Sequence, residues 1–207
     1  MPSNHETQGV LSPLLRNWRL SRVARRITRG SVVLDLACGT GALRHLLPEG
    51  CRYFGVDRIP LSSPPWKTHR GVTAKFLHLD LEHDDSPRVI ADWIRVRPTI
   101  ITMIALLEHL GDSAAFVTRY MPLLDSGGRV VGTTPHPRGR LVHDSLASIG
   151  ICSKDGADEH ETFLGRSELV TISEACGAVL SHYQVFLLGL NQAFEFTFPD
   201  KSADLLT

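Results

Sequence analysis

The sequence has no excess of charge, no clustered cysteines and no long apolar run, and each absence excludes a class of protein. Its 207 residues include 22 Lys and Arg and 22 Asp and Glu, so the formal net charge is zero. No global electrostatic attraction can therefore draw the chain to nucleic acid or to an acidic membrane. Its four cysteines form no CxxC pair, which argues against a zinc site or disulfide framework and favours reduced thiols in a cytoplasmic protein. No stretch approaches about 18 consecutive apolar residues, and the opening MPSNHETQG lacks the apolar centre of a signal peptide.

The composition that is present is that of an ordinary globular protein. Hydrophobic residues make up 43% of the chain and charged residues 21%, which excludes intrinsic disorder for the bulk of it. A chain of this length fits one large α/β domain. We expect a flexible tail over residues 1–10 and a single domain over residues 11–207.

Helical and strand-like segments alternate along this domain. Leu20, Val23 and Ile27 form one apolar stripe at helical spacing, which predicts a helix over residues 11–29. Short aliphatic runs predict strands over residues 31–36, 52–56, 73–79, 98–104 and 129–133, and further helices are expected over 86–94, 113–124 and 167–176. Two closing runs, 179–188 and 192–198, have only three residues between them and predict an antiparallel hairpin.

Strands that are apolar throughout and alternate with helices are typical of a parallel sheet that is covered on both faces. The predicted fold is therefore α/β: a doubly wound, Rossmann-like sheet of about seven strands. Most strands should be parallel, with the antiparallel C-terminal hairpin at one edge and helices on both faces.

The most informative segment is VVLDLACGTGAL, residues 32–43, where a strand runs into a glycine turn. Such a turn lets the backbone approach a ligand closely, and the helix after it offers N–H groups to an anion. The dinucleotide pattern G-x-G-x-x-G is incomplete, because its third glycine position holds Arg44, and the GxxxxGK[ST] phosphate loop is absent. Sixteen residues beyond Gly41, Asp57 closes the second strand, where a carboxylate can accept hydrogen bonds from both ribose hydroxyls of an adenosine.

At this point the sequence resembles the class I S-adenosylmethionine-dependent methyltransferases. LDLACGTG resembles their first motif, YFGVD the second, FLHLDLE the third and TMIALLEHL the fourth, and LLDSGGRVVGTTP resembles the glycine turn and strand that follow. The motifs occur in the family's order over residues 17–198. Within the superfamily the chain is most similar to the O-methyltransferases of ubiquinone biosynthesis, through NWRLSRVARRI, ALLEHL and FLGRSEL.

The resemblance implies S-adenosylmethionine as cofactor and a binding site made of residues at the strand ends. These residues are Arg19 in the helix before the first strand, Asp35, Ala37, Gly39 and Gly41 at the methionine end, Asp57 at the ribose, Arg58, Asp80 and Leu81 around the adenine, and Ile104 at the floor. The alternative for the glycines is a plain turn, and the alternative for Asp57 and Asp80 is a cap at the end of a strand.

Two histidines are the candidate catalytic residues. Methyl transfer from a sulfonium is an in-line displacement, and a hydroxyl acceptor also needs a base, for which histidine suits neutral pH. His109 follows the fourth strand and His136 the fifth, so both lie at the carboxyl edge of the predicted sheet. The alternative for each is a loop histidine that only shapes the pocket. Glu108 could orient either histidine or face solvent.

A metal-assisted mechanism is a further possibility that the sequence argues against. Small-RNA 2′-O-methyltransferases hold a metal with Glu-x-x-Glu-His and a later histidine. Here Ala105 stands at the first glutamate position, and only Glu108 and His109 remain, with His136 or His143 downstream. Because one hard oxygen ligand is lost, we predict no catalytic metal.

The acceptor is the least specified part of the predicted function. Residues 135–165 differ from the ubiquinone-biosynthesis enzymes and are expected to form a lid and acceptor-binding segment.

A stripe of arginines (Arg22, Arg25, Arg26 and Arg29) could bind a phosphate or form a solvated helix face, and no aromatic residues are interleaved with it. We expect methylation of a small or lipid-like acceptor, at oxygen, and no nucleic-acid partner. The alternatives are a glycan, peptide or RNA end as acceptor, or a binding protein without catalysis. No signal for an oligomeric state is present.

Overall fold

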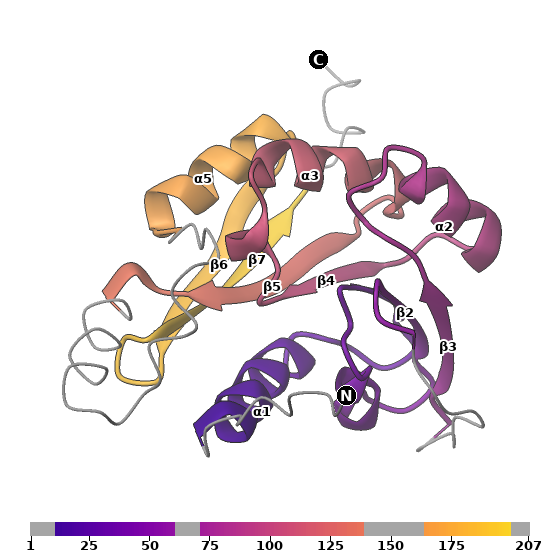
Figure 1. The fold of residues 1–207 in the computed structure, drawn as a ribbon, viewed down its shortest axis with the longest axis horizontal. Coiled ribbons are helices and arrows are strands. Elements are labelled where there is room, and N and C mark those ends of the chain that lie inside the picture. Colours follow the sequence, from indigo (N-terminus) through magenta and orange to yellow (C-terminus); the bar gives the residue numbers. More distant parts are fainter. Residues whose placement is uncertain (1–10, 61–70, 139–163, 200–207) are drawn as a thin grey trace, which may run out of the picture.

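The computed structural model describes residues 11–60, 71–138 and 164–199, and they form a seven-stranded sheet covered by helices (Figure 1). The strand order is β3-β2-β1-β4-β5-β7-β6. The strands are β1 (Val32–Leu36), β2 (Arg52–Asp57), β3 (Thr73–His78), β4 (Ile100–Ile104), β5 (Arg129–Pro135), β6 (Val179–Phe186) and β7 (Asn191–Thr197). Strands β1 to β5 pair in parallel, whereas β7 runs antiparallel to both β5 and β6. The predicted fold class, including the hairpin at one edge, is confirmed.

Helices lie on both faces of this sheet. In Figure 1, α2, α3 and α5 cover one face, and α1 covers the other. The helices are α1 (Leu11–Ala24), α2 (Ser86–Ile94), α3 (Ser113–Tyr120) and α5 (Arg166–Ala175), with short 3-10 turns η1 (Ala42–Leu46), η2 (Leu107–His109) and η3 (Met121–Leu123). Within the described ranges, no helix combines the length and the apolarity needed to span a bilayer.

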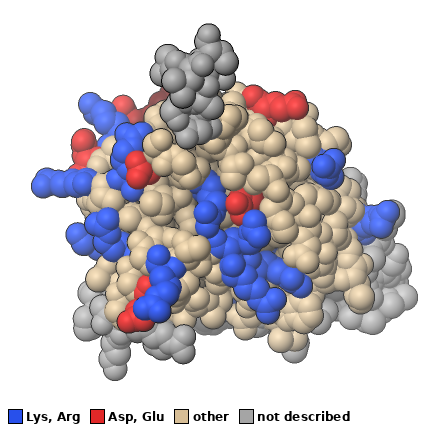
Figure 2. Space-filling model, turned by 180° about the vertical axis from the view of Figure 1, so that it is seen from behind, with Lys and Arg blue, Asp and Glu red and all other residues tan. Residues whose placement is uncertain are grey.

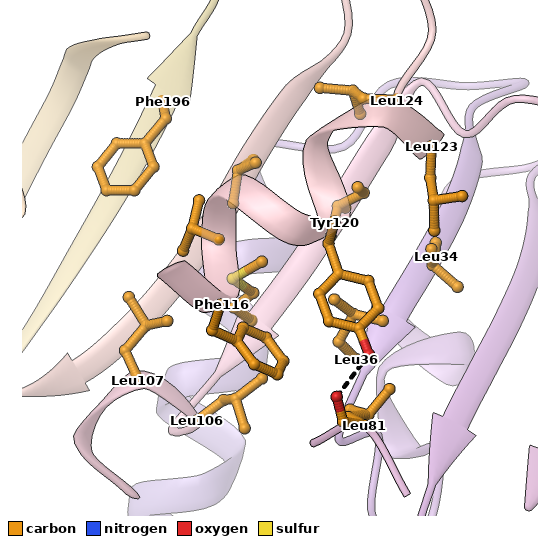
Figure 3. Close-up of a cluster of buried hydrophobic side chains, with 14 of the residues drawn as sticks. Leu34, Leu36, Leu81, Leu106, Leu107, Phe116, Tyr120, Leu123, Leu124 and Phe196 are labelled. Carbon is orange, nitrogen blue, oxygen red and sulfur yellow. Dashed lines mark hydrogen bonds between the residues drawn. The ribbon is translucent and has the colours of Figure 1, made fainter. Parts of the chain in front are cut away.

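The core divides into two clusters, one on each face, because successive strand residues point to opposite sides. Beneath α2, α3 and α5, Leu34 and Leu36 of β1 pack with Phe116, Tyr120 and other apolar side chains (Figure 3). Ile90 of α2 belongs to the same cluster. Beneath α1, a smaller cluster joins strand residues to the stripe predicted from the sequence; its members include Val33, Tyr53, Ile100, Val131, Leu20, Val23 and Ile27.

The first helix is shorter than predicted. It ends at Ala24 and not at residue 29, although Ile27 keeps its place in the core. Arg26 N donates to Val23 O at 2.9 Å, which tightens the helix end, and the side chain of Arg129 on β5 donates to Arg26 O at 2.6 Å. That second bond satisfies a carbonyl that a helix end leaves open. The apolar residues keep their helical spacing beyond the end of the helix, as far as Ile27, because the turn that follows packs against the same core.

The helix predicted over residues 113–124 also divides. Its α-helical part ends at Tyr120, and η3 follows with Pro122 inside it. Proline lacks an N–H and restricts the residue before it, which explains the change to a tighter turn. The predicted tail over residues 1–10, and residues 139–163 of the predicted lid and acceptor segment, lie outside the described residues.

Candidate functional site

The glycine turn after β1 is held in left-handed backbone conformations. Ala37, Gly39 and Gly41 have φ values of 57°, 54° and 64°. A Cβ on Gly41 would lie 2.3 Å from the Phe76 ring, so only glycine fits there. A Cβ on Gly39 would meet nothing within 4 Å, so the turn opens onto space at this position.

Asp57 at the end of β2 binds this turn directly. Its Oδ2 accepts a hydrogen bond from Gly39 N at 2.6 Å, and its Oδ1 accepts one from Ile59 N at 2.9 Å. The side chain is largely buried, and each carboxylate oxygen still has a lone pair for a further donor. The structure therefore brings together the glycine turn and the acidic strand end that the sequence singled out.

Asp35 lies behind the turn, inside the sheet. Its two oxygens accept hydrogen bonds from Tyr53 Oη and Thr102 Oγ1, both at 2.6 Å, so the carboxyl joins β1 to β2 and β4. Burial raises the pKa of Asp35 to about 6, and the two hydroxyl donors oppose that rise. Both oxygens of this predicted cofactor residue are thus engaged by protein hydroxyls.

Cys38, between these aspartates, is a packed thiol. Its Sγ occupies the space that a Cβ on Gly55 would need. Burial, with the nearby charges of Asp35 and Asp57, raises the pKa of the Cys38 thiol, which keeps it protonated. Cys38, Cys51 and Cys176 are all free.

The segment after β3 carries the residues predicted to meet the adenine. Leu79 N donates to Asp57 O at 2.9 Å, which places this segment beside the end of β2. Asp80 is exposed, and its Oδ1 accepts from Glu82 N at 2.9 Å, whereas Leu81 is buried. The Arg58 side chain is exposed.

A second polar region lies where β4 and β5 end. Ile104 there is half-buried, and Glu108 in η2 is buried with its Oε2 lacking any hydrogen-bond partner among the described residues. Burial raises the pKa of Glu108, and the charges of Arg19 and His109 partly oppose this.

Arg19 comes from α1 to this region. Its Nε donates to Asn191 Oδ1 on β7 at 2.6 Å, and its charge lowers the pKa of Glu108. The predicted cofactor residue Arg19 is therefore anchored by the C-terminal hairpin.

The two candidate histidines have different surroundings. His109 is exposed, whereas His136 is partly buried, and burial together with the Arg138 charge lowers its pKa. Its Nδ1 accepts a hydrogen bond from Arg138 N at 3.1 Å, which assigns the ring proton of neutral His136 to Nε2. His143, considered above as a ligand, lies outside the described residues. Among the residues placed by the structure, no three His, Cys, Asp or Glu side chains gather in a way that could hold a metal ion.

The arginine stripe of the sequence is mostly bound to the protein itself. Arg26 pairs with Glu195 at 2.7 Å and Arg29 with Glu49 at 2.7 Å, and Arg22 donates to Gln184 Oε1 at 3.3 Å. Figure 2 shows Lys and Arg side chains gathered near the centre of this side of the molecule, with acidic side chains beside several of them. Because Arg26 and Arg29 pair with carboxylates and Arg22 binds a side-chain amide, these contacts argue against a phosphate grip.

Three features of the site were missed from the sequence. The burial of Glu108, the contact of Asn191 with Arg19 and the two hydroxyls on Asp35 all join residues that are far apart in the chain. The residues next to a carboxylate in the sequence do not indicate which distant groups will bury it. The only signal for Glu108 was its position in the segment Leu107–His109, directly after the fourth strand.

The structural neighbours share this fold. A protein from Bordetella parapertussis described as a possible exported protein superimposes with a TM-score of 0.66 at 16% identity, over 93% of this chain and 71% of that one. The magnesium protoporphyrin IX methyltransferase of Synechocystis PCC 6803, whose structure holds bound SAH, gives a TM-score of 0.53 at 14% identity, over 92% and 80% of the two chains.

Sequence relatives point to one group of enzymes. A ubiquinone biosynthesis O-methyltransferase of Idiomarina loihiensis is 25% identical over 190 residues, which cover 85% of this chain and 72% of the relative. The same enzyme of Xylella fastidiosa is 29% identical over 136 residues, and that match spans only about half of the relative, 53%. The family model described as "Methyltransferase domain" matches residues 11–182. The resemblance inferred from the motifs is confirmed, and this chain belongs to the methyltransferase domain family.

Proposed function

We propose that this methyltransferase transfers the methyl group of S-adenosylmethionine to an oxygen atom of a small or lipid-like acceptor. The observation that carries the proposal is the contact between Asp57 and Gly39, because it joins the carboxylate that would hold the ribose to the turn that would hold the rest of the cofactor. Asp57 retains lone pairs for two hydroxyl donors, and Gly39 opens onto free space, so both fit an adenosine lying across the strand ends.

The residues around the adenine keep the roles implied by the resemblance, whereas those of Arg19 and Asp35 are refined by their contacts. Ala37 and Gly41 would shape the turn, Arg58 would lie beside the adenine with Asp80 and Leu81 at its edge, and Ile104 would form the floor. Arg19 would stand at the methionine end, positioned by Asn191. Asp35 would support the turn from within the sheet, because Tyr53 and Thr102 take its oxygens.

Oxygen as the methylated atom is supported by the end of β4. When bound, the cofactor supplies a methyl group that is already activated, so the chain must align the acceptor, exclude water and accept one proton. Glu108 is a buried carboxyl with an oxygen that lacks a partner among the described residues, and His109 follows it directly. His136 would be neutral at pH 7 because its pKa is lowered. The named activity of the ubiquinone-biosynthesis relatives is also an O-methylation.

The free cysteines favour a cytoplasmic location.

Binding of S-adenosylhomocysteine by the Asp57→Ala variant tests this proposal. We expect its Kd, measured by isothermal titration calorimetry, to rise about 100-fold or more, because a buried carboxylate that meets two hydroxyls is lost. The matched control is Asp92→Ala, which removes an exposed carboxylate on α2 and should leave the Kd within about twofold of the wild-type value.

Two outcomes would contradict the proposal. Equal affinity of Asp57→Ala and wild type for S-adenosylhomocysteine would remove the ribose role. A thermal shift of the wild-type chain with NAD, and none with S-adenosylhomocysteine, would replace the methyl donor by a dinucleotide.

A further inference from the structure

We propose that Ser86, Arg119 and Tyr120 form a clamp that positions residues 80–82 for the adenine of the cofactor. This inference rests on the proposed function, since it assumes that an adenine lies against this segment. The clamp residues do not touch the cofactor themselves. They are positioning residues, and they act by holding three successive backbone carbonyls.

The contacts of the clamp are specific and come from two helices. Ser86 Oγ, in the first turn of α2, donates to Asp80 O at 2.5 Å. Tyr120 Oη, at the end of α3, donates to Leu81 O at 2.7 Å, as the dashed line in Figure 3 shows. Arg119 donates from Nη2 to the same carbonyl at 3.0 Å and from Nη1 to Glu82 O at 3.1 Å.

The burial of these donors indicates more than a surface turn satisfied by chance. Ser86 and Tyr120 are essentially inaccessible, and Arg119 is mostly covered, lying against the rings of Phe116 and Tyr120. An exposed turn could leave its carbonyls to water at little cost, whereas here buried polar groups of the adjoining helix α2 and of the more distant helix α3 meet one short segment. The orientation of that segment is therefore fixed by the helix layer behind it.

The planarity of the peptide bond converts these carbonyl contacts into the orientation of N–H groups. In a trans peptide the C=O of one residue and the N–H of the next point in opposite directions. With Asp80 O held toward α2 by Ser86, the N–H of Leu81 must point away from the helix layer. The N–H of Glu82 points to Asp80 Oδ1 at 2.9 Å, which bends that carboxylate back over the turn. The clamp thus orients the N–H of Leu81 and the carboxylate of Asp80. These are the polar groups of the two residues that the resemblance assigns to the adenine edge.

The connection of this segment to the ribose site supports the same conclusion. Leu79 N donates to Asp57 O at 2.9 Å, one residue before the clamped carbonyls begin. The backbone that would meet the base is therefore fixed on one side by the strand that carries the proposed ribose carboxylate, and on the other by α2 and α3. This arrangement would lower the entropic cost of binding, because the donors are oriented before the ligand arrives.

The Tyr120→Phe variant tests the clamp, because it removes one donor with almost no change in volume. Binding of two ligands would be compared by calorimetry: S-adenosylhomocysteine, and S-inosylhomocysteine, in which hypoxanthine replaces adenine and the rest of the molecule is unchanged. We expect the Kd of the adenine ligand to rise about tenfold and that of the hypoxanthine ligand to rise less than about twofold. Tyr183→Phe is the matched control. It loses one hydrogen bond of 2.8 Å, to Gln192 on the C-terminal hairpin, and should change neither Kd by more than about twofold.

The possible outcomes separate the clamp from the proposed function. An equal rise for both ligands, or no rise for either, overturns the clamp and leaves the cofactor proposal intact. A wild-type chain that binds neither ligand overturns the proposed function and the clamp with it. Should Tyr120→Phe fail to fold, Ser86→Ala carries the same comparison, since it releases the neighbouring carbonyl of Asp80.

Discussion

The two faces of the sheet differ in what they bury. Under α2, α3 and α5, β1 contributes Leu34 and Leu36, and the cluster is almost wholly aliphatic and aromatic (Figure 3). On the α1 side the same strand contributes Asp35, which is buried with the hydroxyls of Tyr53 and Thr102. Burying a carboxyl costs free energy, and here the two hydroxyl donors offset only part of that cost, because the pKa of Asp35 is still raised to about 6. The comparison indicates that the face under α2, α3 and α5 (the apolar face) is held mainly by apolar packing. The face under α1 (the polar face) combines its own apolar cluster with the buried carboxyl behind the glycine turn.

The largest effect should come from a truncation on the apolar face. Ile90→Ala in α2 removes a fully buried side chain and leaves a cavity, so we expect the free energy of unfolding to fall by about 4 kcal/mol. Urea denaturation measures this value. Its neighbour Val89 is 37% exposed, and Val89→Ala should change stability by less than about 0.5 kcal/mol. Similar losses for the two variants would show that the apolar face is not the main source of stability.

A pH-dependent effect should come from the polar face. The folded-state pKa of Asp35 is about 6, above its ordinary 3.8. The folded state therefore binds this proton more tightly than the unfolded state, so the stability that it contributes is full below about pH 4 and is lost as the pH rises through about 6. Against Asp35→Asn, which does not titrate, the wild-type free energy of unfolding should fall by about 3 kcal/mol between about pH 4 and about pH 7.5. Denaturation curves at several pH values measure the difference, and parallel profiles for the two proteins would refute it.

The smallest effect concerns backbone strain where the polar face meets the turn. Ala37 has a φ of 57°, a region that costs a residue with a Cβ about 1 kcal/mol. Ala37→Gly should remove that strain and raise the free energy of unfolding by about 0.5 kcal/mol, since added flexibility of the unfolded chain offsets part of the gain. Ala42→Gly, in the 3-10 turn η1 at ordinary backbone angles, should lower it by a similar amount. Thermal unfolding of both variants checks the opposite signs.

Local signals in the sequence predicted much of the fold and part of the site. The helix over residues 86–94 has the predicted bounds, because Pro87 suits a first helical turn and the apolar spacing is regular. The contact of Asp57 with Gly39 follows from the rule that parallel strands end at one edge of a sheet. The antiparallel hairpin was visible because three residues cannot make a crossover connection.

What the sequence could not predict depends on contacts between distant elements. The helix before β1 ends at Ala24, and the turn after it is held by Arg129, which donates to the carbonyl of Arg26 from β5; nothing near residue 24 signals this contact. Likewise, the environment of Glu108 is made by Arg19 and by the strands around it, and the carbonyls after β3 are held by α2 and α3. Periodicity reports which side of an element is buried, but it does not report which polar groups will meet there.

The place of β7 in the sheet has a consequence for the order in which the protein can be assembled during translation. β7 lies between β5 and β6 and also supplies Asn191 and Glu195, the partners of Arg19 on α1 and of Arg26 in the turn that follows α1. A growing polypeptide in which β1 to β6 have left the ribosome still has an unpaired edge on β5, and its N-terminal segment lacks these two anchors. Unpaired strand edges favour aggregation, so a stalled or truncated nascent chain should depend on chaperones to a degree that the finished protein does not.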